Sequence, residues 1–256
     1  MRKPYLLRTP PYDPTSGGIK VMYGLYGWLL AKGQPAFLNT SIDVPAVGIY
    51  PEIYRGNDMG ARKVIRYILQ KPGMMGTSDE FGTFSTGPNT FHPDDELYIF
   101  SKVYDEWDTP NDHILFLPVI DLHVFKDQNK KRDKIAFYVG KGINLGKHPK
   151  EAIEITKQST ADQQALADKL NECQTLYVYD RLSAIMEVAR LCGVNVVYLG
   201  DMPKEQLALY EPGMNGITYG DEEINELWGL SFRATYEKLI RDFEDKLEMF
   251  IDHTQE

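Results

Sequence analysis

Residues 15–33, Thr-Ser-Gly-Gly-Ile-Lys-Val-Met-Tyr-Gly-Leu-Tyr-Gly-Trp-Leu-Leu-Ala-Lys-Gly, decide the fold class because they join a glycine turn to an amphipathic helix. A short apolar strand, residues 5–7, and a proline-rich turn come before them. Apolar side chains then recur at helical spacing, and a glycine stands where a C-terminal cap belongs. These positions are Ile19, Met22, Leu25, Leu29 and the capping Gly33. A strand, a glycine turn and a helix in this order are typical of an α/β domain.

The glycines at the start of this helix favour an anion-binding site. Gly17 and Gly18 have no Cβ atom that would keep a ligand away from the backbone. The helix that follows directs its unpaired N–H groups and the positive end of its dipole toward the same place. The turn alone predicts little, since an ordinary strand-to-helix connection also uses glycine. Its interpretation depends on a second half-site near residue 180.

Composition places the chain among globular proteins. It has 256 residues, of which 43% are hydrophobic and 25% charged, which suits one large domain or two small ones. The formal net charge of −9 argues against broad, nonspecific binding of nucleic acid. Two cysteines are too few for a disulfide framework. No apolar run reaches about 18 residues and no signal core is present, so we expect a cytoplasmic protein without a membrane span.

Strand-like and helix-like segments alternate along the chain, which predicts an α/β fold with mostly parallel sheets. The expected strands are residues 5–7, 36–39, 47–50, 97–100, 114–120, 135–139, 152–155, 175–179 and 194–199. The expected helices are residues 18–32, 61–70, 161–173, 182–191 and 204–210. From residue 222 to the C-terminus, an apolar stripe predicts one or two further helices.

A polar run, Lys126–Lys134, provides the clearest domain boundary. An apolar segment precedes it, and a new strand that ends in Gly140-Lys-Gly142 follows it. We therefore expect two small Rossmann-like domains facing a cleft, with residues 1–125 in the first and residues 126–228 in the second. Residues 73–95 form a long loop rich in Gly, Ser, Thr and Pro, and loops of this length are usually functional or mobile.

A second strand–turn–helix segment lies at residues 177–197. Its helix opens near Ser183, whose hydroxyl and neighbouring N–H groups suit an anion at a helix N-terminus. Glu187, one turn later, is placed to accept hydrogen bonds from two adjacent hydroxyls, such as those of a ribose. The alternative is structural: Ser183 only caps the helix and Glu187 lies on a solvated face. Residue types and spacing alone favour this alternative.

Five segments together carry a family resemblance. They are Thr15-Ser-Gly-Gly-Ile-Lys-Val21, Ile49-Tyr-Pro-Glu-Ile-Tyr-Arg-Gly-Asn57, Leu117-Pro-Val-Ile-Asp121, Phe137-Tyr-Val-Gly-Lys-Gly142 and residues 177–197. In this order they resemble nucleotide-sugar glycosyltransferases of the GT-B fold, similar to those that assemble bacterial surface polysaccharides. Gly213-Met-Asn-Gly-Ile-Thr-Tyr-Gly220, with Glu222 and Glu223, resembles the segment that follows in that family.

The resemblance implies a fold and a reaction. The first domain would hold the acceptor, the second would hold the nucleotide-sugar donor, and a last helix, residues 229–256, would pack back on the first domain. A hexosyl or pentosyl group would move from a nucleotide-diphosphate donor to a hydroxyl of a glycan or another acceptor. Nucleic acid is not expected as a partner, although a modified base stays open as an acceptor.

The resemblance also assigns donor-binding residues. Gly17 and Gly18 match the loop that approaches the donor diphosphate and the transferred sugar. Lys141 matches the basic residue that follows the first strand of the second domain and neutralises the diphosphate. Arg132 or Lys134 would assist it.

The helix near residue 183 completes the implied donor site. Ser183 and Ala184 match the helix start whose backbone binds phosphate, and Glu187 matches the acidic residue that holds the donor ribose. Many retaining members of the family carry an earlier glutamate, and the corresponding position here is Tyr179. Retention or inversion of the sugar configuration therefore stays open.

An inverting transferase needs a base near the acceptor hydroxyl. Asp79 and Glu80, in the long loop, and Asp13, near the first glycine turn, are the candidates. The alternative is that Asp79 and Glu80 are solvated loop acids. No Asp-x-Asp signature follows a strand, so we expect chemistry without a metal and without a cofactor other than the donor substrate.

Two other functions are open at this stage. His92-Pro-Asp-Asp-Glu96 resembles the metal-binding segment of zinc-dependent sugar deacetylases, but it does not follow a strand and no His-x-x-His pair accompanies it. The second alternative is a non-catalytic module that binds a nucleotide sugar without transferring it. A deacetylase would bind zinc and would lose activity on His92→Ala, whereas a binding module would bind nucleotide without turnover.

Overall fold

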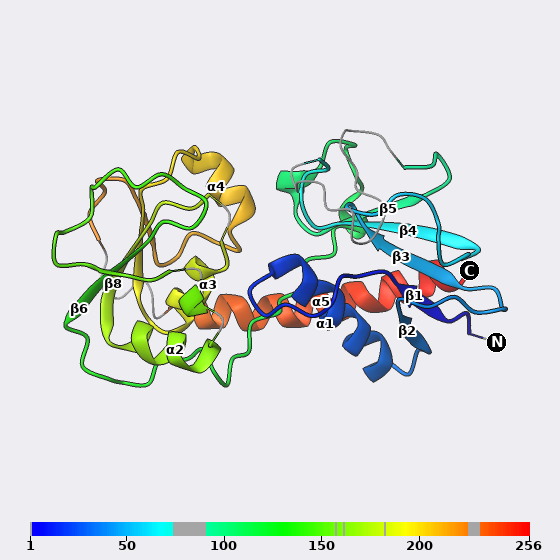
Figure 1. Cartoon of the computed structure of the whole chain (residues 1–256), viewed down its shortest axis with the longest axis horizontal. Helices are drawn as coiled ribbons and strands as arrows, with labels where there is room; N and C mark the ends of the chain where they lie inside the picture. Colours follow the sequence, from blue (N-terminus) through cyan, green and yellow to red (C-terminus); the bar gives the residue numbers. More distant parts are fainter. Residues whose placement is uncertain (1, 74–90, 157, 161, 182, 225–230) are drawn as a thin grey trace. The chain divides into compact units, whose positions relative to one another are not determined.

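The computed structural model describes residues 2–73, 91–156, 158–160, 162–181, 183–224 and 231–256 (Figure 1). The chain divides into two compact units. Unit 1 comprises Met1–Val119 and Leu239–Glu256, and unit 2 comprises Ile120–Lys238. The first division therefore falls six residues before the expected one at 125/126, and the last falls inside the C-terminal helix rather than at residue 229.

Unit 1 is built on a parallel sheet. Its strands are β1 (Tyr5–Leu7), β2 (Ala36–Leu38), β3 (Val47–Pro51), β4 (Lys63–Ile68) and β5 (Glu96–Ile99). In the described part of the unit they pair in the order β2-β1-β3-β4-β5, and every pair is parallel. Helix α1 (Gly17–Ala31) connects β1 to β2. Two short 3-10 helices, η2 (Lys102–Tyr104) and η3 (Asn111–His113), follow β5.

The core of unit 1 lies on one face of this sheet. Successive side chains of a strand point to opposite faces, so Tyr5 and Leu7 of β1 enter this core while Leu6 joins a smaller cluster with Tyr50. The amphipathic side of α1 covers the larger cluster. It contributes Val21, Met22, Leu25 and Leu29. Three of the four predicted positions, Met22, Leu25 and Leu29, are therefore in the core, whereas Ile19 is only partly buried and Val21 was not predicted.

Two predicted elements of unit 1 are wrong. Residues 61–70 are not a helix, because Lys63–Ile68 form β4 between β3 and β5. Arg66, in this strand, is 1% exposed, and its guanidinium donates to Asp95 Oδ2 at 2.7 Å and to the carbonyl of Tyr54 at 3.2 Å. In the sequence pattern, Arg66 suits the polar side of an amphipathic helix, whereas the structure buries it and pairs its donors. Residues 114–120 form no strand either; among the described residues Ile114 makes an isolated bridge to Ile99.

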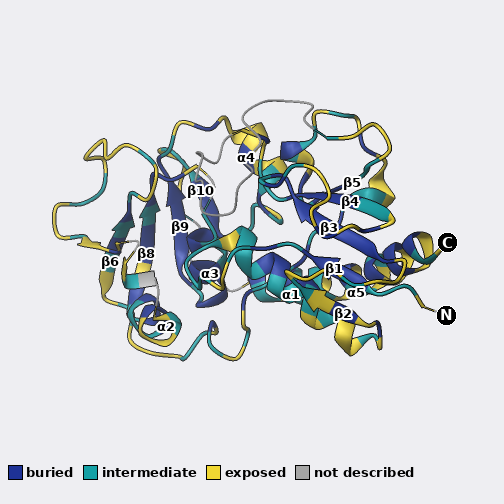
Figure 2. Ribbon diagram, turned by 45° about the vertical axis from the view of Figure 1, so that its right-hand side comes forward, coloured by how far each residue is buried: buried dark blue, intermediate teal, exposed yellow. Residues whose placement is uncertain are grey.

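Unit 2 repeats the architecture of unit 1. Its strands are β6 (Lys134–Tyr138), β7 (Ile153–Glu154), β8 (Cys173–Val178), β9 (Asn195–Tyr198) and β10 (Ile217–Tyr219). Its shorter helices are η4 (Gln158–Thr160), α2 (Gln163–Asn171), α3 (Ile185–Leu191) and α4 (Lys204–Tyr210). The described strands pair in parallel in the order β10-β9-β8-β6-β7, and Figure 2 shows β9 in the dark blue of buried residues.

Both sheets have the same strand order. When the strands of each unit are numbered along the chain, both sheets read 2-1-3-4-5. This is one of the two common orders of doubly wound, Rossmann-like α/β domains. In such a sheet the chain reverses its direction of growth between the first and third strands, and ligands bind at the carboxyl ends of these strands. The switch points are β1/β3 in unit 1 and β6/β8 in unit 2.

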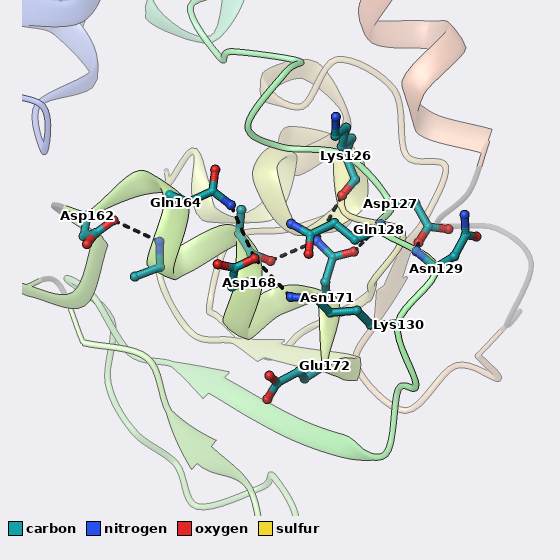
Figure 3. A network of polar contacts seen from close by, with 12 residues as sticks. Lys126, Asp127, Gln128, Asn129, Lys130, Asp162, Gln164, Asp168, Asn171 and Glu172 are labelled. Carbon is teal, nitrogen blue, oxygen red and sulfur yellow. Dashed lines mark hydrogen bonds and ion pairs between the residues drawn. The ribbon is translucent and has the colours of Figure 1, made fainter.

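The polar run at Lys126–Lys134 is part of unit 2 rather than a free linker (Figure 3). Asn171, at the end of α2, is fully buried, and its Oδ1 accepts the backbone N–H of Gln128 at 2.7 Å. Its Nδ2 donates to the carbonyls of Lys126 at 3.0 Å and Ala167 at 2.9 Å. The buried amide of Asn171 thereby fastens the start of this run to α2.

The last helix, α5 (Phe232–Gln255), contributes to both units. Phe232 packs in unit 2 under the guanidinium of Arg190, whose Cζ lies 3.6 Å from the ring centroid. Phe243, Leu247 and Phe250 belong to the core of unit 1. No helix among the described residues is both long and apolar enough to cross a membrane.

Candidate functional site

The loops after β6, β8 and β9 meet at the carboxyl edge of the sheet in unit 2. Gly140 and Gly142 follow β6, and Gly200 follows β9. A Cβ atom on Gly142 would overlap the carbonyl oxygen of Tyr179, which follows β8, and one on Gly200 would overlap the hydroxyl of Tyr198. Glycine at these positions lets three backbone segments approach closely at the switch point between β6 and β8.

Asp180 fixes the loop after β6. It lies directly after Tyr179, is 4% exposed, and its Oδ2 accepts the backbone N–H of Lys141 at 3.1 Å. Gly140 has φ +55, and a Cβ atom there would overlap the same carboxylate. The backbone of Lys141 is therefore held in place while its side chain is exposed. Within the residues that the structure describes, the Lys141 ammonium forms no ion pair or hydrogen bond.

The turn at Ser183 adjoins the same edge. Its Oγ accepts the backbone N–H of Ile185 at 3.4 Å, and its side chain also hydrogen-bonds Tyr138, at the end of β6. Burial raises the pKa of Tyr138, and the bond to Ser183 partly lowers it. Ala184 takes the N-cap position of α3 with helical backbone angles and no side-chain cap. Glu187 stands in the first turn of α3 and is partly buried.

Arg132 does not join this group. It precedes β6 and therefore lies at the amino edge of the sheet, opposite to Lys141. Its guanidinium donates to the carbonyl of Cys173 at 3.3 Å, to the carbonyl of Cys192 at 2.5 Å and to Asp127 Oδ1 at 2.7 Å. These bonds join Arg132 to the start of β8 and to the end of α3, which gives it a structural role, and its donor role stays a prediction. Lys134, its predicted alternative, pairs with Glu172 at the same edge.

Gly17 and Gly18 form the first turn of α1, after the loop of residues 8–16 that leaves the carboxyl end of β1. Ser16 is the N-cap of α1 and accepts the N–H of Ile19 at 3.5 Å. A Cβ atom on Gly17 would meet nothing within 4 Å, so protein packing does not demand glycine there. Asp13 Oδ1 accepts both the backbone N–H of Thr15, at 2.8 Å, and its hydroxyl, at 2.7 Å. Asp13 thus shapes the turn into α1.

The last predicted residues are the acids of the long loop, Asp79 and Glu80, and the His92–Glu96 segment. Asp79 and Glu80 lie outside the described residues. In the His92 segment, the side chains of His92 and Asp94 are exposed, while Asp95 is bound to Arg66. Across the part of the chain that the structure describes, no three His, Cys, Asp or Glu side chains gather as metal ligands would.

Glu52 is a buried acid at the site of unit 1 that the sequence analysis missed. It directly follows β3, is 4% exposed, and accepts the backbone N–H of Leu69, after β4, at 2.8 Å. The side chain of Leu69 also lies beside Gly18, because a Cβ atom built on Gly18 would be 3.6 Å from Leu69 Cδ1. Burial raises the pKa of Glu52 to about 7. A glutamate directly after a wholly apolar strand was the signal available in the sequence.

Comparisons with known proteins leave the function open. No family model matches the chain. No curated protein matches it either. Among solved structures, the chain is similar to the uncharacterized protein KP1_0663 from Klebsiella pneumoniae subsp. pneumoniae NTUH-K2044, with a TM-score of 0.47 and 12% identity over 86% of this chain and 94% of that chain. A similarity at this level carries no information about activity.

Proposed function

We propose that the protein is a glycosyltransferase that uses a nucleotide-diphosphate sugar, with two Rossmann-like units related as in the GT-B fold. The observation that carries the proposal is the repeated sheet, because both units have strand order 2-1-3-4-5. In unit 2 a glycine-containing loop follows the first strand, and in unit 1 the helix after the first strand begins with Gly17 and Gly18. Unit 2 would bind the donor and unit 1 would bind the acceptor.

In unit 2 the proposed ligand is the diphosphate. The Lys141 ammonium would neutralise it, and the backbone N–H groups of Ser183 and Ala184, at the start of α3, would donate hydrogen bonds to its oxygens. Because the loops are held by Asp180 and by close glycine contacts, these donors need little rearrangement as charge develops on the departing diphosphate. Glu187 would accept hydrogen bonds from the ribose hydroxyls.

In unit 1 the proposed partner is an acceptor hydroxyl, on a glycan or another molecule. The open space at Gly17 leaves room for the transferred sugar beside the start of α1. Asp79 and Glu80 are retained as proposed bases. Asp13 is a weaker base candidate, because its carboxylate already accepts two hydrogen bonds from Thr15.

Titration calorimetry with UDP, GDP, ADP, dTDP and CMP tests the donor site. We expect one nucleoside diphosphate to bind, with EDTA having no effect, and Lys141→Ala to weaken its binding by about tenfold, as expected when a charged hydrogen bond to phosphate is lost. Lys131→Ala is the matched control, because it removes the same charge from an exposed lysine on the amino side of β6.

Two results would count against the donor site. Equal affinities in the Lys141 and Lys131 variants would remove the site from the loop after β6. Absence of binding by every nucleotide, together with a melting temperature that falls on addition of EDTA, would favour the deacetylase alternative instead.

A further inference from the structure

Arg181 and Asp201 form an exposed ion pair at the carboxyl edge of the sheet in unit 2. Arg181 follows β8 and Asp201 follows β9. The Arg181 Nε donates to Asp201 Oδ1 at 2.6 Å, and Nη2 donates to Oδ2, so both arms of the guanidinium fork are used. The two side chains are 62% and 58% exposed.

The ion pair lies beside the proposed phosphate-binding loop. Asp180, the residue before Arg181, accepts the backbone N–H of Lys141 at 3.1 Å. A Cβ atom on Gly142 would also lie against the backbone of Tyr179 and Asp180, so the loop that carries Lys141 contacts the segment that leads into Arg181. Along this edge the loops after β6, β8 and β9 carry a lysine, an arginine and an aspartate in turn.

Other contacts hold these loops in place. The Tyr198 hydroxyl accepts the backbone N–H of Met202 at 3.3 Å, and the Tyr219 hydroxyl donates to the carbonyl of Met202 at 2.9 Å. An exposed ion pair contributes little to stability, because water solvates both partners and the side chains lose freedom. The guanidinium of Arg181 can therefore exchange its partner without disturbing the sheet.

A diphosphate is a better partner for this fork than a carboxylate. It carries more charge, and phosphate oxygens match the two parallel N–H groups of arginine. We propose that Arg181 is a second diphosphate ligand beside Lys141, and that Asp201 competes with the ligand for it. This inference rests on the proposed function, since it adds a residue to the same donor site.

If Asp201 competes with the ligand, removing Arg181 and removing Asp201 change the ligand affinity in opposite directions. If the ion pair only stabilises the loops, both changes weaken binding. In calorimetry of the full chain with inorganic pyrophosphate and with the nucleoside diphosphate that binds best, Asp201→Asn should tighten binding about two- to fivefold, the range expected for release of an exposed pair. Arg181→Gln should weaken binding about tenfold, and Arg181→Lys, which keeps the charge without the fork, should fall between.

The double variant separates competition from general electrostatics. If Asp201 acts through Arg181, Asp201→Asn has no effect when Arg181 is already Gln, whereas a long-range charge effect would persist. Asp133→Asn, an exposed and paired acid on the amino side of β6, is the charge control and should change affinity little. Melting temperatures without ligand should be nearly equal for all these variants.

Each outcome decides between the claims. Weaker binding in both Arg181→Gln and Asp201→Asn would show that the ion pair only stabilises the loops, and would overturn the proposed competition. Binding that depends on Lys141 but not on Arg181 would overturn this inference and leave the proposed function standing. Absence of binding by the wild-type chain would overturn both.

Discussion

Replacing Glu52 with glutamine should remove the pH dependence that this buried carboxyl group gives to the stability of unit 1. The carboxyl group is buried after β3, and burial raises its pKa from the ordinary 4.5 to about 7. Glutamine has the same shape, carries no charge at any pH, and keeps an oxygen that can accept the N–H of Leu69. The substitution therefore removes ionisation and little else.

The expected magnitude follows from the pKa difference. A change from 4.5 to about 7 corresponds to about 3 kcal/mol, since one pKa unit is about 1.4 kcal/mol. Because the folded state holds the proton more tightly than the unfolded state, this stability is fully present below pH 4.5 and is lost as the pH rises through 7. Wild type and Glu52→Gln should thus be equally stable near pH 4.5, and the variant about 3 kcal/mol more stable near pH 8.

Urea unfolding between pH 4.5 and 8.5 measures this difference. Trp28 reports on unit 1, because its ring packs against Phe243 with centroids 5.7 Å apart, and its fluorescence is isolated by replacing Trp107 and Trp228 with Phe in all variants. Two units can unfold separately, so the curves are fitted with two transitions. Asp43→Asn, an exposed acid in the same unit, is the control and should leave the profile unchanged. A difference between Glu52→Gln and wild type that is constant with pH would refute the reasoning.

Three further predictions concern unit 2. Gly142→Ala should lower the melting temperature more than Gly146→Ala, because a Cβ atom on Gly142 overlaps the Tyr179 carbonyl. A Cβ atom on Gly146 (φ +63) meets open space, so that variant loses only about 1 kcal/mol of backbone energy. Equal losses in calorimetric scans would contradict the close loop packing. Arg190→Met should lower the free energy of unfolding in urea by about 3–5 kcal/mol, because it leaves the buried Glu211 unpaired. Adding Glu211→Gln should restore part of this loss. A double variant no more stable than the single one would argue against charge as the cause. Asn171→Ala removes three hydrogen bonds of a buried side chain and should cost about 2–3 kcal/mol. Trypsin should then cleave within Lys126–Lys134 faster than in wild type, and an unchanged cleavage rate would show that this run is held by other contacts.

Local patterns in the sequence predicted much of the fold. The amphipathic spacing and flanking glycines located α1 within one residue, and α4 occupies Lys204–Tyr210 as expected. β4 was misread because Arg66 breaks its apolar pattern, and the partners that make its burial possible come from distant segments. β10 was missed because three residues between glycine turns carry too short a pattern to indicate a strand.

The candidate site could be predicted where strand direction decides placement. Lys141 and Ser183 follow two adjacent parallel strands, so both lie at one edge of the sheet. Arg132 precedes β6 and therefore lies at the opposite edge of the sheet from Lys141. The roles of Asp180 and Glu52 could not be predicted, since their partners, Lys141 and Leu69, are 39 and 17 residues away. Such pairing is set by sheet order, which the sequence pattern does not contain.

Turnover of a donor tests the central claim most directly. The full chain is incubated with each nucleotide-diphosphate sugar, with and without mixed glycan acceptors, and the released nucleoside diphosphate is measured by mass spectrometry. The account predicts that one donor is consumed, that a glycan accelerates its consumption, and that Lys141→Ala slows it while Lys131→Ala does not. A donor that binds but stays intact under all these conditions would contradict the account and identify a module that binds nucleotide sugars without transferring them.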